Sequence, residues 1–332
     1  MNQVTVSVPL SGDIFSRICG SFDCNIKKVD KTFGVSSVYR NDELKVSGSE
    51  ADARQALYVF RQLMALSQKG TDIAEQQLDY AIDLSREKSN LSISDVGDDI
   101  IAHTTTGKPI SARTFGQQDY VNQMREKMIV FGVGPAGTGK TYLAMAMAIT
   151  AFKNEEVGRI ILTRPAIEAG EKLGFLPGDL QSKVDPYLRP LYDALYQIMG
   201  ADAFARNMEK GLIEVAPLAY MRGRTLDNAY IILDEAQNTT PAQMKMFLTR
   251  IGFGSKVVIT GDQTQIDLAP GVKSGLKDAL NVLKGIDDIG ICTLTSKDVV
   301  RHPLVQKIVK AYEKNENKRK KSSGEKAGFR KK

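Results

Sequence analysis

The stretch FGVGPAGTGKTYLAMAMA, residues 131–148, decides the fold of this chain. An apolar run leads into a glycine-rich turn, and a stretch of helical composition leaves it. The turn matches the pattern GxxxxGK followed by Ser or Thr at every fixed position, in the strand-to-helix context that this pattern needs. Its residues are Gly134, Pro135, Ala136, Gly137, Thr138, Gly139, Lys140 and Thr141. The sequence therefore predicts a phosphate-binding loop between a strand and a helix.

A loop of this kind binds phosphate through local physics. Glycines allow backbone N–H groups to turn inward, and the N-terminus of the following helix adds the positive end of its dipole. Lys140 is expected to reach the β- and γ-phosphates, and the Thr141 hydroxyl is expected to ligate Mg²⁺. We therefore expect a nucleoside triphosphate with Mg²⁺ at this loop.

Apolar runs of strand length alternate with helical or polar connections from residue 117 onward. The runs cover residues 128–134, 159–165, 229–235, 256–262 and 290–295. This alternation predicts parallel βαβ units in a doubly wound α/β sheet that is covered on both faces. The long connection over 165–228 predicts inserted helices.

Two further apolar runs end in polar side chains suited to hydrolysis. The run AYIILDE ends in Asp234, which is expected to hold Mg²⁺ through a water, and Glu235, which can polarise the attacking water as general base. In ITGDQTQIDL, Asp262 and Gln265 are expected to project toward the site, where the Gln265 amide would sense the γ-phosphate. Upstream, Gln117 would read the adenine edge, or it is a surface glutamine.

Residues 1–86 show the order strand, helix, helix, strand, strand, helix, with a further helix at the end. This is the order of a small α+β module of the KH type, which clamps a nucleic-acid backbone with a GXXG loop. The corresponding positions here are Gly20, Ser21, Phe22 and Asp23. The negative charge of the aspartate disfavours a phosphate at this loop. We expect a KH-like module that binds RNA in another way or binds protein.

The remaining segments are a linker and a tail. Residues 87–114 are predicted to be a linker with a hairpin at TTTGKPI, and residues 115–313 form the phosphate-loop domain. The tail, residues 314–332, holds nine Lys/Arg and two Glu, so its net charge is +7. The net charge of the whole chain is +6, so the other residues sum to −1. Such a tail cannot bury enough apolar surface to fold, and it either contacts phosphate backbones or only solubilises the protein.

Cysteine content and hydropathy indicate the compartment. The three cysteines, Cys19, Cys24 and Cys292, form neither a disulfide framework nor a zinc-binding pattern. The sequence contains no run of 18 apolar residues that would cross a membrane. We therefore expect a cytoplasmic protein without a membrane anchor.

Residues 113–308 resemble the PhoH-like ATPases, and the resemblance extends into the N-terminal module. The segments that carry it are RTFGQQDY, GPAGTGKT, TRPAIEAGEKLGFLPGDLQSKVDPYLRPLYDAL, MRGRTLDNAYIILDEAQNTT, ITGDQTQIDL and DVVRHPLV. The core of that family is similar to the RecA-like first motor domain of superfamily 1 helicases. The resemblance implies a cytoplasmic ATPase that is connected with RNA processing and often linked to an endoribonuclease of the YbeY type.

The same match implies the roles of individual residues. Lys140, Asp234 and Glu235 take the roles derived above, and Gln117 and Gln265 take those of nucleotide-reading glutamines. The pair Phe115-Gly116 before Gln117 departs from the family pattern, which affects the expected turn but not the glutamine.

The predicted site lacks an arginine to neutralise charge on the γ-phosphate. Only 98 residues follow Asp234, too few for a second motor domain. A neighbouring subunit in a homo-oligomeric ring, most simply a hexamer, would supply the arginine. The best candidates are Arg222 and Arg224, and the others are Arg164, Arg189 and Arg301.

Two functions of different classes remain open. The first is an ATPase that binds or remodels single-stranded RNA, as a helicase-like factor. The second is a nucleotide-gated adaptor that hydrolyses ATP slowly and recruits an endoribonuclease or a ribosome-maturation factor. A small-molecule kinase is disfavoured, because Glu235 and Gln265 favour water as the nucleophile.

Overall fold

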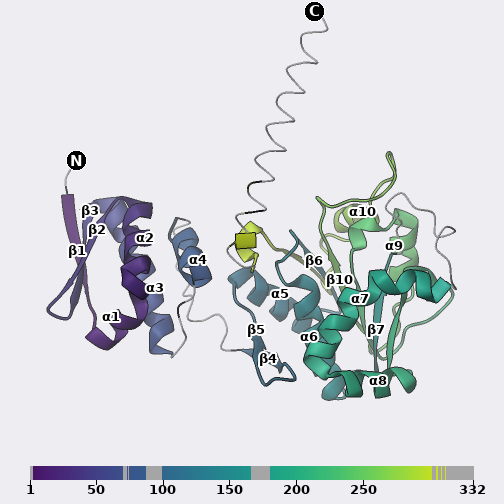
Figure 1. The fold of residues 1–332 in the computed structure, drawn as a ribbon. Helices are drawn as coiled ribbons and strands as arrows, with labels where there is room; N and C mark the ends of the chain where they lie inside the picture. The colour runs from purple at the N-terminus through teal and green to yellow at the C-terminus, as the bar shows by residue number, and fades with distance from the viewer. Residues whose placement is uncertain are drawn as a thin grey trace, which may run out of the picture. The chain divides into compact units, whose positions relative to one another are not determined.

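The computed structural model describes residues 3–69, 73, 75–86, 99–165, 180–300, 304–305, 308 and 311, without the side chains of 76 and 180–187. The chain divides into two compact units, residues 1–90 with 300–332 and residues 91–299 (Figure 1). The predicted tail lies outside the described residues. No described helix is long and apolar enough to cross a membrane.

The N-terminal unit has the predicted order of elements. Its strands β1 (Gln3–Pro9), β2 (Ser36–Arg40) and β3 (Glu43–Ser49) form an antiparallel sheet in the order β1-β3-β2. Its helices are α1 (Gly12–Ile18), α2 (Cys24–Phe33), α3 (Glu50–Gln68) and α4 (Glu75–Arg86). Apolar side chains of α3, among them Phe60 and Leu63, are fully buried with Leu44 and Val46 of β3. The alternating apolar residues of the strands therefore identify the face of the sheet that the helices cover.

Two turns in this unit use left-handed backbone conformations. Asn41 and Asp42, with φ of 54° and 55°, connect β2 to β3, as the twist of a two-residue hairpin requires. Between α1 and α2, Phe22 and Asp23 have φ of 55° and 58°, and the Phe22 side chain is 94% exposed. An aromatic residue therefore stands at the tip of the loop where a KH module carries its clamp.

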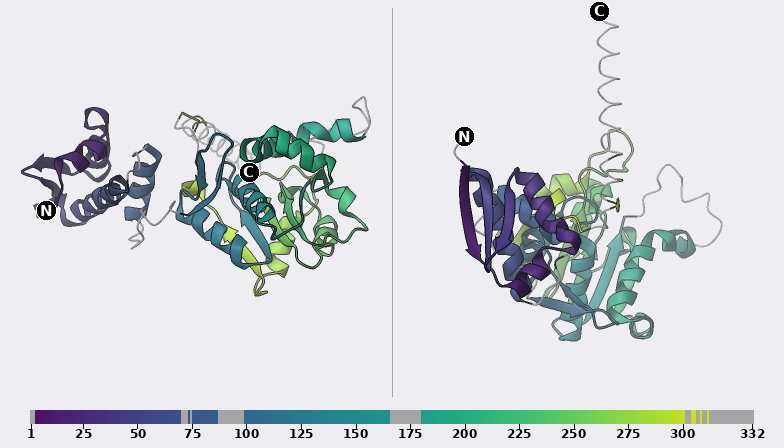
Figure 2. Two further views of the ribbon diagram at one scale, coloured as in Figure 1. Left: turned by 90° about the horizontal axis from the view of Figure 1, so that it is seen from below. Right: turned by 60° about the vertical axis from the view of Figure 1, so that its left-hand side comes forward.

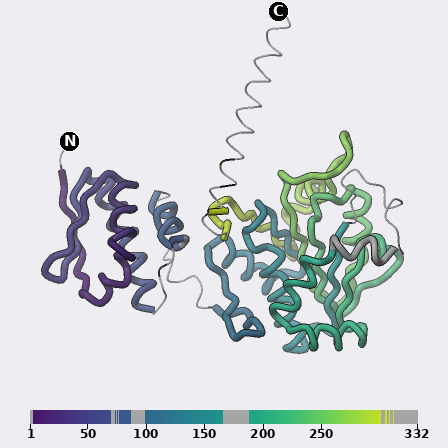
Figure 3. The backbone as a smooth tube through the Cα atoms, in the orientation of Figure 1, coloured from purple at the N-terminus to yellow at the C-terminus, as the bar shows by residue number. Residues whose placement is uncertain are grey.

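The second unit is a parallel α/β sheet. In the described residues, six parallel strands lie in the order β11-β6-β10-β9-β7-β8. They are β6 (Ile129–Val133), β7 (Arg159–Arg164), β8 (Ile213–Pro217), β9 (Ala229–Leu233), β10 (Lys256–Gly261) and β11 (Ile289–Thr293). The tube trace shows β11, near the end of the unit, returning to lie beside β6 (Figure 3). The sheet confirms the predicted fold class, and it adds β8, which the sequence did not reveal.

Helices cover both faces of this sheet (Figure 2). Their bounds are α5 (Phe115–Glu126), α6 (Lys140–Lys153), α7 (Leu180–Met199), α8 (Ala201–Glu209), α9 (Pro241–Leu248) and α10 (Gly275–Val282), with short turns η4 (Leu218–Met221), η5 (Ala236–Asn238) and η6 (Ser296–Asp298). Ile232 belongs to a buried cluster with side chains of α5 to α8, whereas Ile231 belongs to a cluster with side chains of α9 and α10. Adjacent residues of one strand thus face opposite layers, which explains why the strands are apolar throughout.

The hairpin predicted at TTTGKPI is confirmed, but it belongs to the second unit and is not part of a linker. Strands β4 (Ile100–His103) and β5 (Pro109–Ser111) form an antiparallel hairpin, and Ile101 and Ile110 belong to the same buried cluster as α6. The Thr150 hydroxyl of α6 donates a hydrogen bond to the Ile101 carbonyl at 2.8 Å. The hairpin is therefore part of the second unit, because its few apolar side chains are buried there. Residues 87–98 of the predicted linker lie outside the described residues.

Candidate nucleotide-binding site

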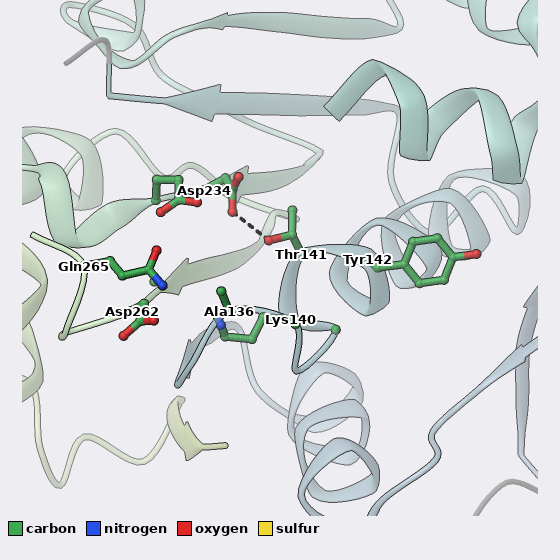
Figure 4. A pocket seen from close by; sticks show the side chains of 11 residues that line it. Ala136, Lys140, Thr141, Tyr142, Asp234, Asp262 and Gln265 are labelled. Carbon is green, nitrogen blue, oxygen red and sulfur yellow. Dashed lines mark hydrogen bonds between the residues drawn. The ribbon is translucent and has the colours of Figure 1, made fainter. Parts of the chain in front are cut away.

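The candidate site lies where three parallel strands end. β6, β9 and β10 are neighbours, and Gly261 pairs with Val133 while Ile259 pairs with Leu233. The loops after these strands therefore meet at one edge of the sheet, the usual place for a ligand in such folds. A pocket of about 250 Å³ opens there, lined by Ala136, Gly137, Gly139, Lys140, Thr141, Tyr142, Asp234, Glu235, Gly261, Asp262 and Gln265 (Figure 4).

The phosphate loop requires glycine at two positions for different reasons. A Cβ at Gly134 would lie 2.3 Å from the Leu294 carbonyl oxygen, so the backbones approach too closely for any side chain. Gly139 has φ of 80° directly before α6, a conformation that residues with a Cβ rarely adopt. The glycines of the motif therefore set the backbone path on which the cradle depends.

Lys140 is buried and folded back onto the loop. Its ammonium donates to the carbonyl oxygens of Gly134 and Pro135 at 2.6 and 2.7 Å and to the Thr138 hydroxyl at 3.3 Å. These acceptors are neutral, whereas phosphate oxygens are anionic and would add the attraction of opposite charges to each hydrogen bond. The loop therefore fits a phosphate group.

Asp234 connects the loop to the strand tips. Its Oδ1 accepts hydrogen bonds from the hydroxyl of Thr141 at 2.7 Å and from that of Thr260 at 2.6 Å, and the side chain is 7% exposed. In Figure 4, Thr141 points toward Asp234, whereas Tyr142 points away from both. Mg²⁺ is usually held by one or two protein oxygens together with phosphate and water. A hydroxyl and a carboxylate at one point of the pocket fit that requirement, and no group of three or more His, Cys, Asp or Glu that could hold a metal occurs among the described residues.

Glu235 lies in the pocket with a left-handed backbone, φ 53°. Its Oε1 lies 3.6 Å from a guanidinium nitrogen of Arg164, and its Oε2 accepts a hydrogen bond from the Gln237 side chain. The sequence placed Arg164 only among candidates from a neighbouring subunit, whereas it contacts Glu235 of its own chain.

The loop after β10 is fixed to the residues that follow Glu235. The Gln237 side chain accepts a hydrogen bond from the backbone N–H of Asp262 at 3.0 Å, and the Asn238 side chain accepts one from Asp267 at 2.8 Å. Sequence reasoning did not single out Gln237 or Asn238, although both directly follow the Asp-Glu pair. Gln265 lines the pocket and is exposed, and its role as a γ-phosphate sensor stays a prediction.

Asp262 also lines the pocket, with one oxygen bonded and one unpaired. Its Oδ1 accepts from the backbone N–H and hydroxyl of Thr264 at 2.9 and 2.7 Å. Its Oδ2 is buried with no hydrogen-bond partner in the described structure. Buried polar atoms are normally satisfied, so this oxygen marks a place for a donor in the occupied pocket.

Gln117 differs from the prediction. It is 3% exposed and does not line the pocket. Its amide nitrogen donates to the Thr138 carbonyl at 3.0 Å, and its amide oxygen accepts from the Arg113 backbone N–H at 2.8 Å. The side chain therefore supports the phosphate loop on the side away from the pocket. To bind an adenine edge, it would have to break these two hydrogen bonds.

The two preferred arginines do not line the pocket. The Arg224 guanidinium forms two hydrogen bonds to Glu214, at 2.6 and 2.7 Å, and these bonds raise the pKa of Arg224. Arg222 and Arg189 are exposed, and Arg301 lies outside the described residues. Action in a neighbouring subunit stays a prediction for these residues, and Arg224 would first have to leave Glu214.

The strand order, the phosphate loop after β6 and the carboxylates after β9 define a P-loop nucleoside triphosphatase. Residues 109–313 match the family model described as PhoH-like protein. The chain is 55% identical to the PhoH-like protein of Bacillus subtilis, over 89% of this chain and 92% of that protein. It is 47% identical to the PhoH-like protein of Synechocystis, over 96% and 97%. The chain therefore belongs to the PhoH-like protein family.

Other likenesses cover less of the chain. Protein PhoH of Escherichia coli is 48% identical over 61% of this chain and 58% of its own length. Among solved structures, the SWI2/SNF2 ATPase core of Sulfolobus solfataricus in complex with double-stranded DNA matches with a TM-score of 0.34 and 16% identity, over 56% of this chain and 45% of that one. The Pif1 helicase of Candida albicans matches with a TM-score of 0.28 and 14% identity, over 55% and 40%.

Proposed function

We propose that the protein hydrolyses ATP with Mg²⁺ and couples hydrolysis to the binding or remodelling of single-stranded RNA. The observation that carries the hydrolytic part is the Thr141–Asp234 hydrogen bond, which brings the end of the phosphate loop to the carboxylate after β9. Lys140 and Glu235 line the same pocket. One pocket thus offers groups for phosphate, metal and water.

The chain's own side chains have separable tasks. With a nucleotide bound, Lys140 would exchange the carbonyls of its loop for phosphate oxygens, and Thr141 and Asp234 would hold Mg²⁺. When bound, Mg²⁺ neutralises charge on the β- and γ-phosphates. The water oxygen bonds to the γ-phosphorus while the bond to the bridging oxygen breaks, with its electron pair leaving on ADP. Glu235 accepts the water proton and releases it to solvent.

The coupling to RNA is supported by the chain outside the pocket. The N-terminal unit has the element order of a KH-type module, and the tail beyond residue 313 is strongly basic. Basic segments bind phosphate backbones by releasing counterions. We also propose a cytoplasmic location and a homo-oligomeric ring, and an endoribonuclease of the YbeY type as a partner.

The test is ATP hydrolysis with and without single-stranded RNA at two salt concentrations. We expect K140A and E235Q to reduce hydrolysis by at least a hundredfold, and chelation of Mg²⁺ to abolish it. K153A, which removes an exposed lysine from the other end of α6, is the matched control and should leave hydrolysis unchanged. Strong stimulation by RNA supports the proposal, whereas a flat response supports the nucleotide-gated adaptor.

Completion of the site between subunits has its own test. Mixing R224A subunits with K140A subunits should restore part of the hydrolysis, because intact sites then form between unlike neighbours. If no mixture recovers activity, Arg224 does not act in a neighbouring subunit, and the same mixture is made with Arg222→Ala.

A further inference from the structure

We propose that Arg164 is a positioning residue that holds the Glu235 carboxylate away from the attacking water in the resting site, and so limits basal hydrolysis. The inference rests on the proposed function, because it assigns a role in the same reaction. It concerns a contact within one chain, unlike the arginine expected from a neighbour.

The strand pairing places Arg164 beside the catalytic carboxylates. Arg164 is the last residue of β7, and Thr163 directly before it pairs with Leu233 of β9. The backbone N–H of Asp234 donates to the Thr163 carbonyl at 2.9 Å, so the two strands stay together up to their tips. Parallel pairing thus carries Arg164 alongside the Asp-Glu pair.

The carboxylate of Glu235 is held from two sides. A guanidinium nitrogen of Arg164 lies 3.6 Å from Oε1, with the two side chains 22% and 35% exposed, so solvent screens the pair only partly. The Gln237 amide donates to Oε2. Gln237 is itself 1% exposed, and its own oxygen is bonded to the Asp262 backbone. Oε2 of the carboxylate therefore accepts a hydrogen bond, whereas Oε1 is attracted to the Arg164 charge in an ion pair longer than a hydrogen bond.

A general base must present a lone pair to the water that it deprotonates. Arginine can only donate hydrogen bonds, and it stays protonated in proteins, so it cannot pass the proton on. The left-handed backbone at Glu235, φ 53°, is uncommon for a residue with a Cβ and persists only where surrounding contacts hold it. The ion pair with Arg164 therefore competes with the attacking water for the position of the Glu235 carboxylate.

Arg164 acts through Glu235 and not on the nucleotide. Glu235 lines the pocket, whereas Arg164 does not. Removing the guanidinium should therefore change the rate of hydrolysis and leave nucleotide binding unchanged. This separation of kcat from KM distinguishes a positioning role from a contact with phosphate.

The experiment measures kcat and KM for ATP, without RNA, in the full-length chain. R164A is expected to raise kcat about threefold to tenfold, which corresponds to about 0.6–1.4 kcal/mol, with KM unchanged. R164K keeps the charge and should fall between R164A and wild type. R125A, which breaks the ion pair with Asp99 on the same unit, is the matched control and should leave kcat unchanged.

Several outcomes overturn the proposal. A fall in kcat for R164A means that the guanidinium assists the reaction, and a change in KM means that it contacts the nucleotide. In single-turnover experiments, adding R164A to E235A must leave the hydrolysis rate unchanged. A change in that rate would show that Arg164 acts by a route other than Glu235. Thermal unfolding checks that each variant is folded, and R164K and R164Q replace R164A if it is not.

Failure of the inference differs from failure of the proposed function. If K140A and E235A hydrolyse ATP as fast as wild type, the hydrolysis site itself is wrong. If both variants are inactive while R164A matches wild type, only the role of Arg164 is wrong.

Discussion

Replacing Gln117 by alanine tests whether this side chain reads the base or supports the phosphate loop. The structure gives its amide two partners, the Thr138 carbonyl at 3.0 Å and the Arg113 backbone N–H at 2.8 Å. Thr138 is fully buried, so its carbonyl would lose its partner without access to water. A buried polar group left unsatisfied costs about 1–3 kcal/mol.

The cost at the other partner is smaller. Arg113 is exposed, so its N–H can turn to water, and we expect less than about 1 kcal/mol there. Q117A should therefore lower the free energy of unfolding by about 1–4 kcal/mol in total. Because Thr138 belongs to the phosphate loop, the affinity for ATP and GTP should fall together, by roughly tenfold or about 1.4 kcal/mol.

The assay combines urea unfolding with titration of fluorescent ATP and GTP analogues. Q118A, at the next position of α5, is the matched control, since its side chain bonds only to residues remote from the loop, Asn122 and Asp99. We expect Q118A to change stability by less than about 0.5 kcal/mol. A loss of ATP affinity with GTP affinity intact would refute the reasoning, because it would show that the amide of Gln117 reads the adenine.

Three other predictions concern stability and the loop. Burial, and then the nearby Asp119 carboxylate, raises the pKa of the Cys292 thiol from 9.0 to about 12. The folded state thus holds this proton more tightly, so its contribution to stability is complete below pH 9 and is lost as pH rises toward 12, by up to about 1.4 kcal/mol per pH unit. Urea unfolding measured against pH should show that the difference in the free energy of unfolding between wild type and C292A narrows only in that range. A difference that stays constant with pH contradicts this prediction. G134A places a Cβ within 2.3 Å of the Leu294 carbonyl oxygen. It should destabilise the protein by about 1–3 kcal/mol and weaken the binding of an ATP analogue. Unchanged binding would mean that the loop accommodates a methyl group. F60A leaves a cavity at a fully buried position of the N-terminal unit. It should lower the free energy of unfolding in urea by about 3–5 kcal/mol. A loss below about 1 kcal/mol would show that the core collapses around the cavity.

The sequence revealed most of what depends on short stretches of chain. The phosphate loop is contiguous, and its glycines, Lys140 and Thr141 have the same requirements wherever the loop lies in the fold. The alternation of apolar runs and helices predicted the parallel sheet, because strands buried on both faces must be apolar throughout. β8 was missed because its five residues, IEVAP, include a glutamate and end in a proline.

Other assignments depended on which distant segments meet. The sequence predicted the hairpin of β4 and β5 but placed it in a linker, since only its packing against α6 shows that Ile101 and Ile110 are core residues. Arg224 was a natural choice for a free arginine until the structure paired it with Glu214 on β8. Neither contact follows from the residue types alone, because each of these side chains would be equally acceptable on a solvated surface.

The sequence by itself thus predicted the chemistry that we propose for the site: a phosphate cradle, a metal-binding carboxylate and a base, each indicated by adjacent residues. The tertiary structure decided what surrounds them. The order of strands brings β7 beside β9, and this places Arg164 against Glu235 across 71 positions of the sequence. It also turns Gln117 to the back of the loop instead of the pocket. Hydrogen bonds and ion pairs act over only a few ångströms, so these partners exist only once the sheet has formed.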